Sequence, residues 1–151
     1  MRQAALQHAQ TLCASHNSLF LSTLSNNRKD FPFASIAQYL YGTDKHFYLF
    51  ISDIAQHSKN LTKHPQLSFM ILNQQQQDDA ENPRVTVMAT AEKLARENSQ
   101  ALLSEFIQQH PKAAQYAELA DFHIWRLTVE RVRYIGGFGQ AFWLEKQQWY
   151  E

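Results

Sequence analysis

The segment HFYLFISDIAQHSKNL (His46–Leu61) decides how the rest of this sequence is interpreted. Its aromatic first half is typical of a buried strand. Its second half, at about 54–63, suits a short helix that Asp53 can cap, with Gln56 three residues later as the reciprocal partner. His57 lies in that helix, at a place where an anion-binding protein would carry lysine or arginine. The junction therefore indicates a ligand site and raises the question of which ligand it takes.

Length and charge limit the classes of protein that fit. The chain has 151 residues, 44% of them hydrophobic, so one domain over 1–151 is expected. Its 14 basic residues balance 14 acidic ones without forming a basic block, which argues against nucleic acid as a partner. No apolar run approaches the roughly 20 residues of a membrane span or resembles a signal peptide, so we expect a cytoplasmic protein. Cys13 is the single cysteine and is expected to be a small buried residue.

Apolar periodicity and turn residues predict many short strands with helices around them. Helices are expected at 2–16, about 54–63 and within 92–109, with a further short one from Pro111 to Leu119. Strands are expected at Leu19–Leu24, Pro32–Tyr41, His46–Ile51, Leu67–Leu72, Arg84–Ala91, Phe122–Val129 and Val132–Ile135, with 141–144 as a short strand or arm. Turns are expected at Ser25–Asp30 and Gly42–Asp44, and a solvated loop at Gln74–Asn82. Mostly consecutive strands favour an α+β, mainly β fold, an antiparallel barrel with peripheral helices.

Three of the four glycines lie together just after a strand, at Gly136, Gly137 and Gly139. No Lys-Ser/Thr pair and no helix follows, so a nucleotide phosphate loop is excluded. We interpret the cluster as a bulged or tightly packed strand end, at a barrel rim or a subunit contact. A loop that packs closely on a ligand is the alternative.

Three polar residues are candidates for a binding site. Local pattern leaves His57 open between a hydrogen-bond donor to a carboxylate or phosphate and an exposed side chain. Arg84 is the only basic residue between Lys63 and Lys93, and its planar guanidinium can bind both oxygens of a carboxylate. An edge arginine in water is the other interpretation. Asp121 directly precedes an aromatic strand, where it could orient an imidazole or cap a loop.

Other chemistry finds little support in the sequence. The histidines show no i, i+4 pair with a third ligand, so no metal cluster held by the protein is predicted. No Ser/His/Asp or Cys/His order and no G-x-S-x-G elbow is present, which disfavours hydrolase chemistry.

Three stretches carry a family resemblance: FYLFISDIAQHSKNLTKHPQLSFMIL, RVTVMATAEKL and DFHIWRLTVERVRYIGGFGQAFW. Together they resemble the pyridoxamine-5′-phosphate-oxidase-like split β-barrel superfamily and, within it, the HugZ/HutZ haem-utilisation branch. The similarity runs from about Ala4 to Trp143. Its most specific parts are Ile51–Leu61, with a His-Ser-x-Asn core, and Gly137–Ala141.

The resemblance implies a homodimer of six- or seven-stranded antiparallel split β-barrels that hold a planar cofactor at the subunit cleft. In the broader superfamily the cofactor is FMN. In the HugZ-like branch it is haem, which some members open oxidatively to release iron. FMN brings a phosphate dianion, met in oxidase-type members by basic residues on an early strand and at the segment matching Gln56–His57. This chain has no Lys or Arg within Leu19–Ser25 or Phe31–Gly42, although Arg28, Lys29 and Lys59 could compensate.

For haem, the resemblance implies that Arg84 lies at the distal face as the catalytic residue, with His57, Lys59 and Asp121 also binding the cofactor. Asp121 would hydrogen-bond an axial histidine. Relatives take that histidine from a C-terminal extension, whereas no histidine follows His123 in this sequence, so the metal ligand stays unassigned.

Three functions remain in competition. The leading one is a haem-binding protein of iron acquisition, with haem-degrading oxygenase activity as its catalytic form. The others are an FMN-dependent oxidoreductase and a haem carrier without activity. The sequence leaves open whether the protein is an enzyme.

Overall fold

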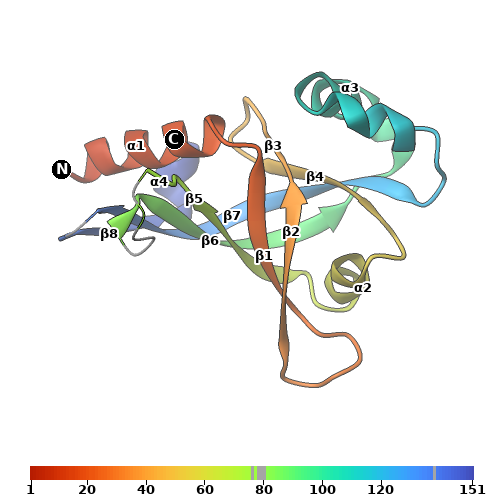
Figure 1. Ribbon diagram of the computed structural model, residues 1–151, viewed down its shortest axis with the longest axis horizontal. Coiled ribbons are helices and arrows are strands. Elements are labelled where there is room, and N and C mark those ends of the chain that lie inside the picture. The colour runs from red at the N-terminus through yellow and green to blue at the C-terminus, as the bar shows by residue number, and fades with distance from the viewer. Residues whose placement is uncertain (76, 78–80, 138) are drawn as a thin grey trace.

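The computed structural model describes residues 1–75, 77, 81–137 and 139–151. Figure 1 shows strands at the centre and helices at the margins. The strands are β1 (Ser18–Leu24), β2 (Pro32–Gln38), β3 (Leu40–Tyr41), β4 (Phe47–Ser52), β5 (Gln66–Leu72), β6 (Arg84–Lys93), β7 (Phe122–Gly137) and β8 (Gln140–Glu145). The helices are α1 (Arg2–Ala14), α2 (Gln56–Lys63), α3 (Gln100–Gln109) and α4 (Lys146–Tyr150), with 3-10 turns η2 (Arg96–Asn98) and η3 (Pro111–Tyr116).

The strands form one antiparallel sheet in the order β2-β1-β5-β6-β7-β4-β3, with β8 paired to β7. The sheet is strongly curved, so that β1 and β2 cross in front of β6 and β7 in Figure 1. This confirms the mainly β, antiparallel barrel expected from the sequence. The described residues make eight strands rather than six or seven. One reason is that the expected strand Pro32–Tyr41 divides at Tyr39, whose N–H donates to the carbonyl of Asn17.

The aromatic run of β4 is buried along its whole length because both faces of the strand are covered. Phe47, Leu49 and Ile51 belong to the main core inside the curved sheet. Tyr48 and Phe50 point the other way, into a second cluster under α3. A continuous apolar run is what a strand covered on both faces requires.

Helices α1 and α4 complete the main core at one end of the sheet. Cys13 of α1 is fully buried, as expected from the sequence. Trp149 of α4 is also fully buried, and its indole N–H donates to the carbonyl of Lys45 at 3.0 Å. A capping box joins Glu145 and Gln148 at the start of α4. The sequence analysis did not predict this helix.

Three local predictions were wrong. Strand β6 continues past its predicted end at Ala91 to Lys93, and the helix expected within 92–109 is α3, at Gln100–Gln109. Helix α2 begins at Gln56 with Ala55 at the cap position and no side-chain cap, and the Asp53 carboxylate binds Lys93 and His123 instead. The two strands expected between Phe122 and Ile135 are one strand, β7.

The glycine cluster forms a bulge at the end of β7, as one interpretation of the sequence proposed. The β7–β8 register shifts between Ile135 and Gly137. Gly137 and Gly139 have φ of +124° and +77°, which favour glycine. Phe138, and part of the loop expected at Gln74–Asn82, lie outside the described residues.

No helix in the described part of the chain is long and apolar enough to cross a membrane.

Candidate functional site

An aromatic cleft lies where β2, β4, α2 and the α3–η3 segment meet. Its volume is about 350 Å³, within the approximate range of small-molecule sites. We call it the aromatic cleft; its lining is Ile36, Ala37, Gln38, Phe50, Ile51, His57, Phe106, Lys112, Ala113, Tyr116 and Phe122. Its rings contact one another: the Tyr116 and Phe122 rings stack at 5.0 Å and the Phe50 ring lies 5.3 Å from Phe122. The walls are therefore largely apolar, and their aromatic rings pack against one another.

His57 is the one imidazole in the lining of this cleft. Its Nδ1 lies 3.1 Å from Oγ of Ser35 on β2. Burial lowers the pKa of His57 below its usual value of 6.5, because a charged imidazolium loses hydration there. The ring is therefore neutral near pH 7. The sequence placed His57 correctly in α2, but nothing in it indicated the contact with Ser35.

Asn60, one helical turn after His57, fixes α2 against the sheet. Its side-chain amide donates to the Thr23 hydroxyl at 2.9 Å, and its carbonyl oxygen accepts from the Asn26 backbone and the Gln56 side chain. Asn60 is fully buried, so each of these bonds replaces hydration that the side chain has lost. This network orients the helix face that carries His57, and explains part of the His-Ser-x-Asn core.

A charged cluster stands at the start of α2. The Asp53 carboxylate lies 3.1 Å from His123 Nδ1 and 3.0 Å from the Lys93 ammonium. Asp121 lies nearby, because its backbone carbonyl accepts from the N–H of Asp53 at 2.6 Å. The Asp121 carboxylate itself accepts the Ser52 hydroxyl at 2.7 Å. Asp121 thus lies beside α2, near His57 in the fold, with one carboxylate oxygen engaged by Ser52.

Arg96 fixes the segment that carries Asp121. Its guanidinium donates to the backbone carbonyls of Ala117, Leu119 and Phe122. Three acceptors on one short segment give it a defined path into β7. The sequence analysis missed Arg96 because its partners are backbone atoms distant in sequence.

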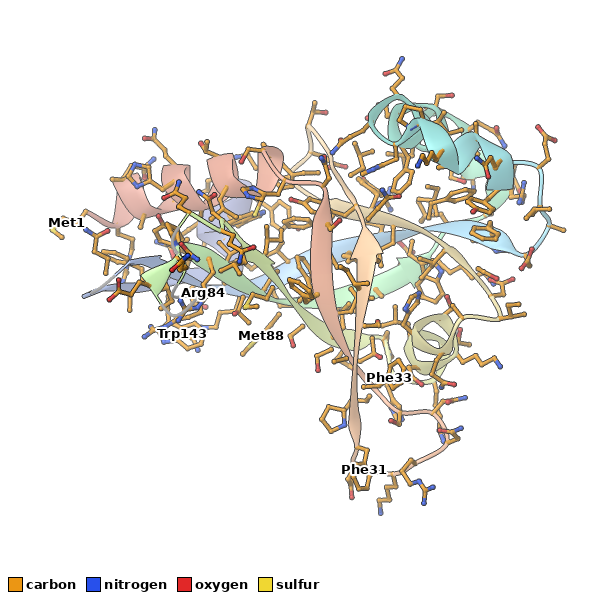
Figure 2. All side chains as sticks on the ribbon, viewed as in Figure 1. Met1, Phe31, Phe33, Arg84, Met88 and Trp143 are labelled. Carbon is orange, nitrogen blue, oxygen red and sulfur yellow. The ribbon has the colours of Figure 1, made fainter. Side chains whose placement is uncertain are left out.

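Arg84 lies at the opposite end of the molecule from α2. It begins β6, whereas Lys93, which ends the same strand, binds Asp53. A ten-residue strand spans about 30 Å, so one protomer cannot place Arg84 and His57 on the same small ligand. Figure 2 shows Arg84 in the left half of the molecule near Trp143, far from α2. Its guanidinium donates to the Asn82 carbonyl at 3.3 Å.

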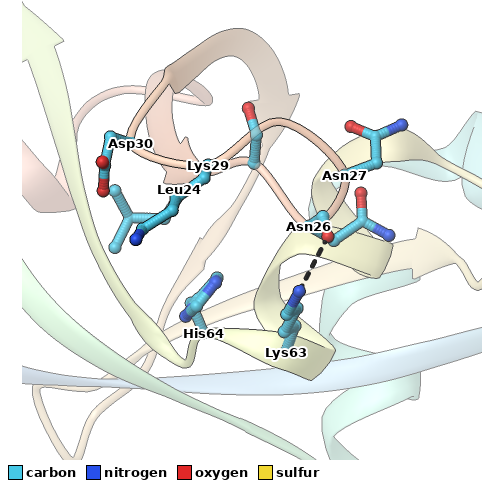
Figure 3. A pocket seen from close by; sticks show the side chains of 8 residues that line it. Leu24, Asn26, Asn27, Lys29, Asp30, Lys63 and His64 are labelled. Atoms are coloured by element: carbon cyan, nitrogen blue, oxygen red, sulfur yellow. Dashed lines mark hydrogen bonds between the residues drawn. The ribbon is translucent and has the colours of Figure 1, made fainter.

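The remaining cations considered in the sequence are spread around the hairpin loop and α2. Lys59 is exposed on α2 and is absent from the lining of the aromatic cleft. Arg28 lines a neighbouring hollow with Gln56, Phe31 and Phe33. Lys29 lines a separate pocket of about 530 Å³ between the β1–β2 loop and the end of α2 (Figure 3).

That pocket is mixed in charge. Lys63 and His64 also line it, but so does Asp30. The Lys63 ammonium donates to the Asn26 carbonyl (Figure 3). Its cations are therefore partly engaged, and it does not form a dedicated phosphate clamp.

No group of three or more His, Cys, Asp or Glu side chains is placed to hold a metal ion in the portion of the chain that the structure describes.

The curved antiparallel sheet with a cleft beside α2 defines the protein as a split β-barrel. A solved structure of a pyridoxinephosphate oxidase family protein from Clostridium acetobutylicum has this fold, with a TM-score of 0.75, 14% identity, and coverage of 99% of this chain and all of that chain. The family model of the CREG beta-barrel matches residues 1–151, and the chain belongs to this family.

Two curated proteins that are similar in sequence are both named as heme oxygenases. The chain is 29% identical over 122 residues to the non-canonical heme oxygenase HOZ, chloroplastic, of Arabidopsis thaliana, covering 81% of this chain and 37% of that protein. It is 30% identical over 121 residues to the heme oxygenase HutZ of Vibrio cholerae, covering 74% of this chain and 65% of that one. The matched region is thus about a third and about two thirds of the length of these relatives.

A solved structure whose name also refers to heme is similar to this chain. The heme binding protein from Mycobacterium smegmatis superposes with a TM-score of 0.87 at 29% identity, and the match covers 97% of this chain and 60% of that one. The resemblance seen in the sequence to haem-utilisation proteins of the split-barrel fold is confirmed.

Proposed function

We propose that the protein binds haem in haem utilisation, and that the aromatic cleft is the part of the site that one protomer provides. One observation carries the proposal: the cleft combines aromatic walls with a neutral imidazole, His57, and with Lys112 at its lining. Haem is a planar apolar ring with an iron ion and two carboxylates, and this lining fits all three features. The names of HOZ, HutZ and the mycobacterial protein support the same cofactor.

FMN fits this cleft less well. Its phosphate dianion needs fixed positive charge, yet Lys112 is the only Lys or Arg in the lining and burial keeps His57 neutral. Lys29 and Lys63 lie in a different pocket, with Asp30 among them. Flavin binding therefore remains the weaker alternative.

We further propose that the site is completed by a second copy of the chain. Arg84 belongs to the outer face of the sheet, at the end of β6 remote from His57. If both act on one haem, as the resemblance implies, the arginine must come from the partner subunit. In that arrangement Arg84 contacts the haem or its bound ligand from the other side as the catalytic residue, while His57 and Asp121 act from the α2 side.

The outer face of β1, β5 and β6 supports this assembly. Phe20, Leu24 and Met88 are exposed on it, and paired small polar residues lie between them, including Ser22 opposite Ser68. These side chains share one face because they are direct cross-strand neighbours or alternate along a strand. The centre of this face is apolar with small polar side chains, and Glu130 and Arg131 of β7 stand at its border; such a centre suits close approach of an identical surface.

In the proposed haem site, each side chain has a separate role. Bound haem supplies the iron at which dioxygen chemistry takes place. The aromatic walls exclude water from the ring, and Lys112 and the exposed Lys59 are available for its carboxylates. Asp121, which Ser52 engages through one oxygen, can accept a hydrogen bond from an imidazole near the iron.

Titration with ferric haem tests the proposal. We expect saturable binding with a sharpened and shifted Soret band, one haem per site, and no retention of FMN through gel filtration. A Soret band that stays that of free haem would contradict haem binding, and a yellow protein carrying FMN would favour the flavin alternative. Loss of the haem band with a reductant and oxygen distinguishes an oxygenase from a carrier.

Arg84→Ala tests the catalytic assignment. We expect the protein to stay folded and to bind haem, but to consume it at least about tenfold more slowly, because a charged donor facing the ligand is lost. Arg126→Ala is the matched control, since Arg126 is a strand arginine whose guanidinium contacts Glu92 and Tyr48. Equal rates in the two variants would place Arg84 outside the reaction.

The organisation of 1–151 as one domain and the cytoplasmic location remain proposals. A single sheet that includes strands from both halves of the chain supports the first.

A further inference from the structure

We propose that Arg133 binds a carboxylate of the haem that lies in the aromatic cleft of the partner subunit. The inference rests on the proposed haem function and on the proposed assembly, and it adds a residue that neither the sequence nor the comparisons assign to a ligand. Three observations carry it: the place of Arg133 beside Arg84, the indole ring under its guanidinium, and the lack of an acidic partner for it among the described residues.

Arg133 shares the outer face of the sheet with Arg84. Arg84 of β6 pairs with Ile135 of β7, and Arg133 lies two residues before Ile135. Val132 and Tyr134, the neighbours of Arg133, belong to the main core and point the other way. Diagonal neighbours such as these two arginines lie about 7 Å apart. A ligand as large as a porphyrin that meets Arg84 from outside the sheet can therefore also meet Arg133.

Trp143 of β8 supports the guanidinium of Arg133. The two residues are cross-strand partners, and the guanidinium carbon lies 4.9 Å from the centre of the indole ring. Arg131 lies over the same ring at 3.9 Å. Figure 2 shows Trp143 near Arg84. The ring gives the Arg133 guanidinium a defined place, but it supplies no oxygen acceptor for the N–H groups.

The three arginines of β7 differ in their partners. Arg126 contacts the Glu92 carboxylate at 3.3 Å, and Arg131 contacts the Glu145 carboxylate at 3.0 Å. Arg133 is partly exposed, and its guanidinium makes no hydrogen bond or ion pair with the described residues. A planar guanidinium can donate two N–H groups to one carboxylate at once. Of these three arginines, Arg133 is therefore the one whose donors are left for a carboxylate from outside the chain.

Haem has the matching chemistry. Its iron lies at the centre of the porphyrin, and its two carboxylates lie at the rim. In the proposed assembly Arg84 contacts the haem or its bound ligand, so a second arginine about 7 Å along the same face is placed toward the rim. Lys112 lines the cleft on the α2 side, and Arg133 adds a carboxylate contact from the other protomer. Both subunits then contribute to holding the same haem.

Titration with haem and with haem dimethyl ester tests the assignment without reference to activity. The ester keeps the ring and the iron but has no free carboxylate. We expect Arg133→Gln to bind haem at least about tenfold more weakly than wild type, because charge-assisted hydrogen bonds are lost. Wild type and Arg133→Gln should bind the ester equally. Arg126→Gln is the matched control, since Arg126 lies on the same strand but contacts Glu92, and it should bind both ligands as wild type does.

The outcomes are distinguishable. Wild-type protein that binds no haem would remove the proposed function itself, whereas haem binding that is unchanged in Arg133→Gln would overturn only the carboxylate assignment. Equal weakening of haem and ester in Arg133→Gln, with circular dichroism showing a folded protein, would also overturn it, since Arg133 would then act on the ring or on the assembly. An equal loss of haem binding in Arg126→Gln would mean that positive charge in general, rather than this residue, attracts haem.

Discussion

The region around α2 and the outer face of β6 differ in how fully their side chains are satisfied. Beside α2, the buried Asn60 is paired within the chain, with Thr23, Asn26 and Gln56, although the buried Ser58 hydroxyl has no partner among the described residues. On the outer face, Met88 and its neighbours remain in water, although their opposite sides form the main core. The region around α2 is held mainly by hydrogen bonds within the chain, whereas the outer face is the surface that we propose for a second copy.

This difference shows how the work of a binding site can be divided. A rigid, internally bonded helix is suited to hold His57 in a fixed orientation, because its position does not depend on the ligand. An open apolar face that carries Arg84 at its end is suited to deliver that residue to another copy. The three predictions below test this division, beginning with the largest expected effect.

Met88→Lys should separate the proposed dimer. Burying an ammonium in this largely apolar interface, next to the Arg131 that pairs with position 88, should weaken association by at least about 100-fold, while circular dichroism remains that of the folded protein. Sedimentation velocity measures the dissociation. Leu119→Lys is the matched control, because Leu119 is 44% exposed and Met88 45%, but Leu119 lies outside this face. A Met88→Lys protein that stays as associated as the control would mean that the face is not the interface.

Asn60→Leu should destabilise the fold of each protomer. The substitution removes the acceptor of the Asn26 N–H, one acceptor of the Gln56 side chain and the donor to the buried Thr23 hydroxyl, which should lower the free energy of unfolding by about 2–3 kcal/mol. Urea denaturation measures it. Lys59→Ala, next to it in α2 but exposed, should change the value by less than about 0.5 kcal/mol. Similar values for the two variants would show that the network contributes little.

The pH dependence of stability should show a smaller effect of His57. Its pKa is lowered in the folded protein below 6.5, so near pH 6 the unfolded chain binds protons at this residue that the folded protein does not. The contribution of the neutral ring is therefore complete above about pH 7 and is lost as pH falls through 6.5 toward the folded-state pKa. Wild-type protein should lose stability relative to His57→Gln over this interval, measured by denaturation at several pH values. A constant difference between the two proteins would show that His57 is hydrated.

Much of the architecture could be predicted because it depends on local chemistry. Period-two alternation located β1, β5 and most of β6, and the glycine cluster indicated the bulge after β7. Boundaries failed where distant partners decide them. The bond between Tyr39 N–H and the Asn17 carbonyl accompanies the break in the second predicted strand, and pairing with β7 carries β6 on to Lys93.

The site was predicted only in part. His57 and Asp121 were found by type and position, and the structure brings them to the same end of the molecule. Asn60 and Arg96 were missed, since a buried asparagine and an arginine bound to carbonyls leave no periodic signal. Helix α4, which carries Trp149, was also missed, although the sequence contains a signal for it: Glu145 and Gln148 have the spacing of a capping box.

The sequence by itself determined the class of fold, the buried aromatic strand and the helix that presents a histidine where a cation was expected. It could do so because alternation, turn residues and side-chain types act over a few neighbouring positions. Only the tertiary structure decided that His57 meets Ser35 beside rings from α3 and η3, and that Arg84 lies at the end of β6 remote from Asp53 and α2. These relations depend on strand register and on which face of the sheet each residue occupies, and both are settled by contacts between segments far apart in the chain.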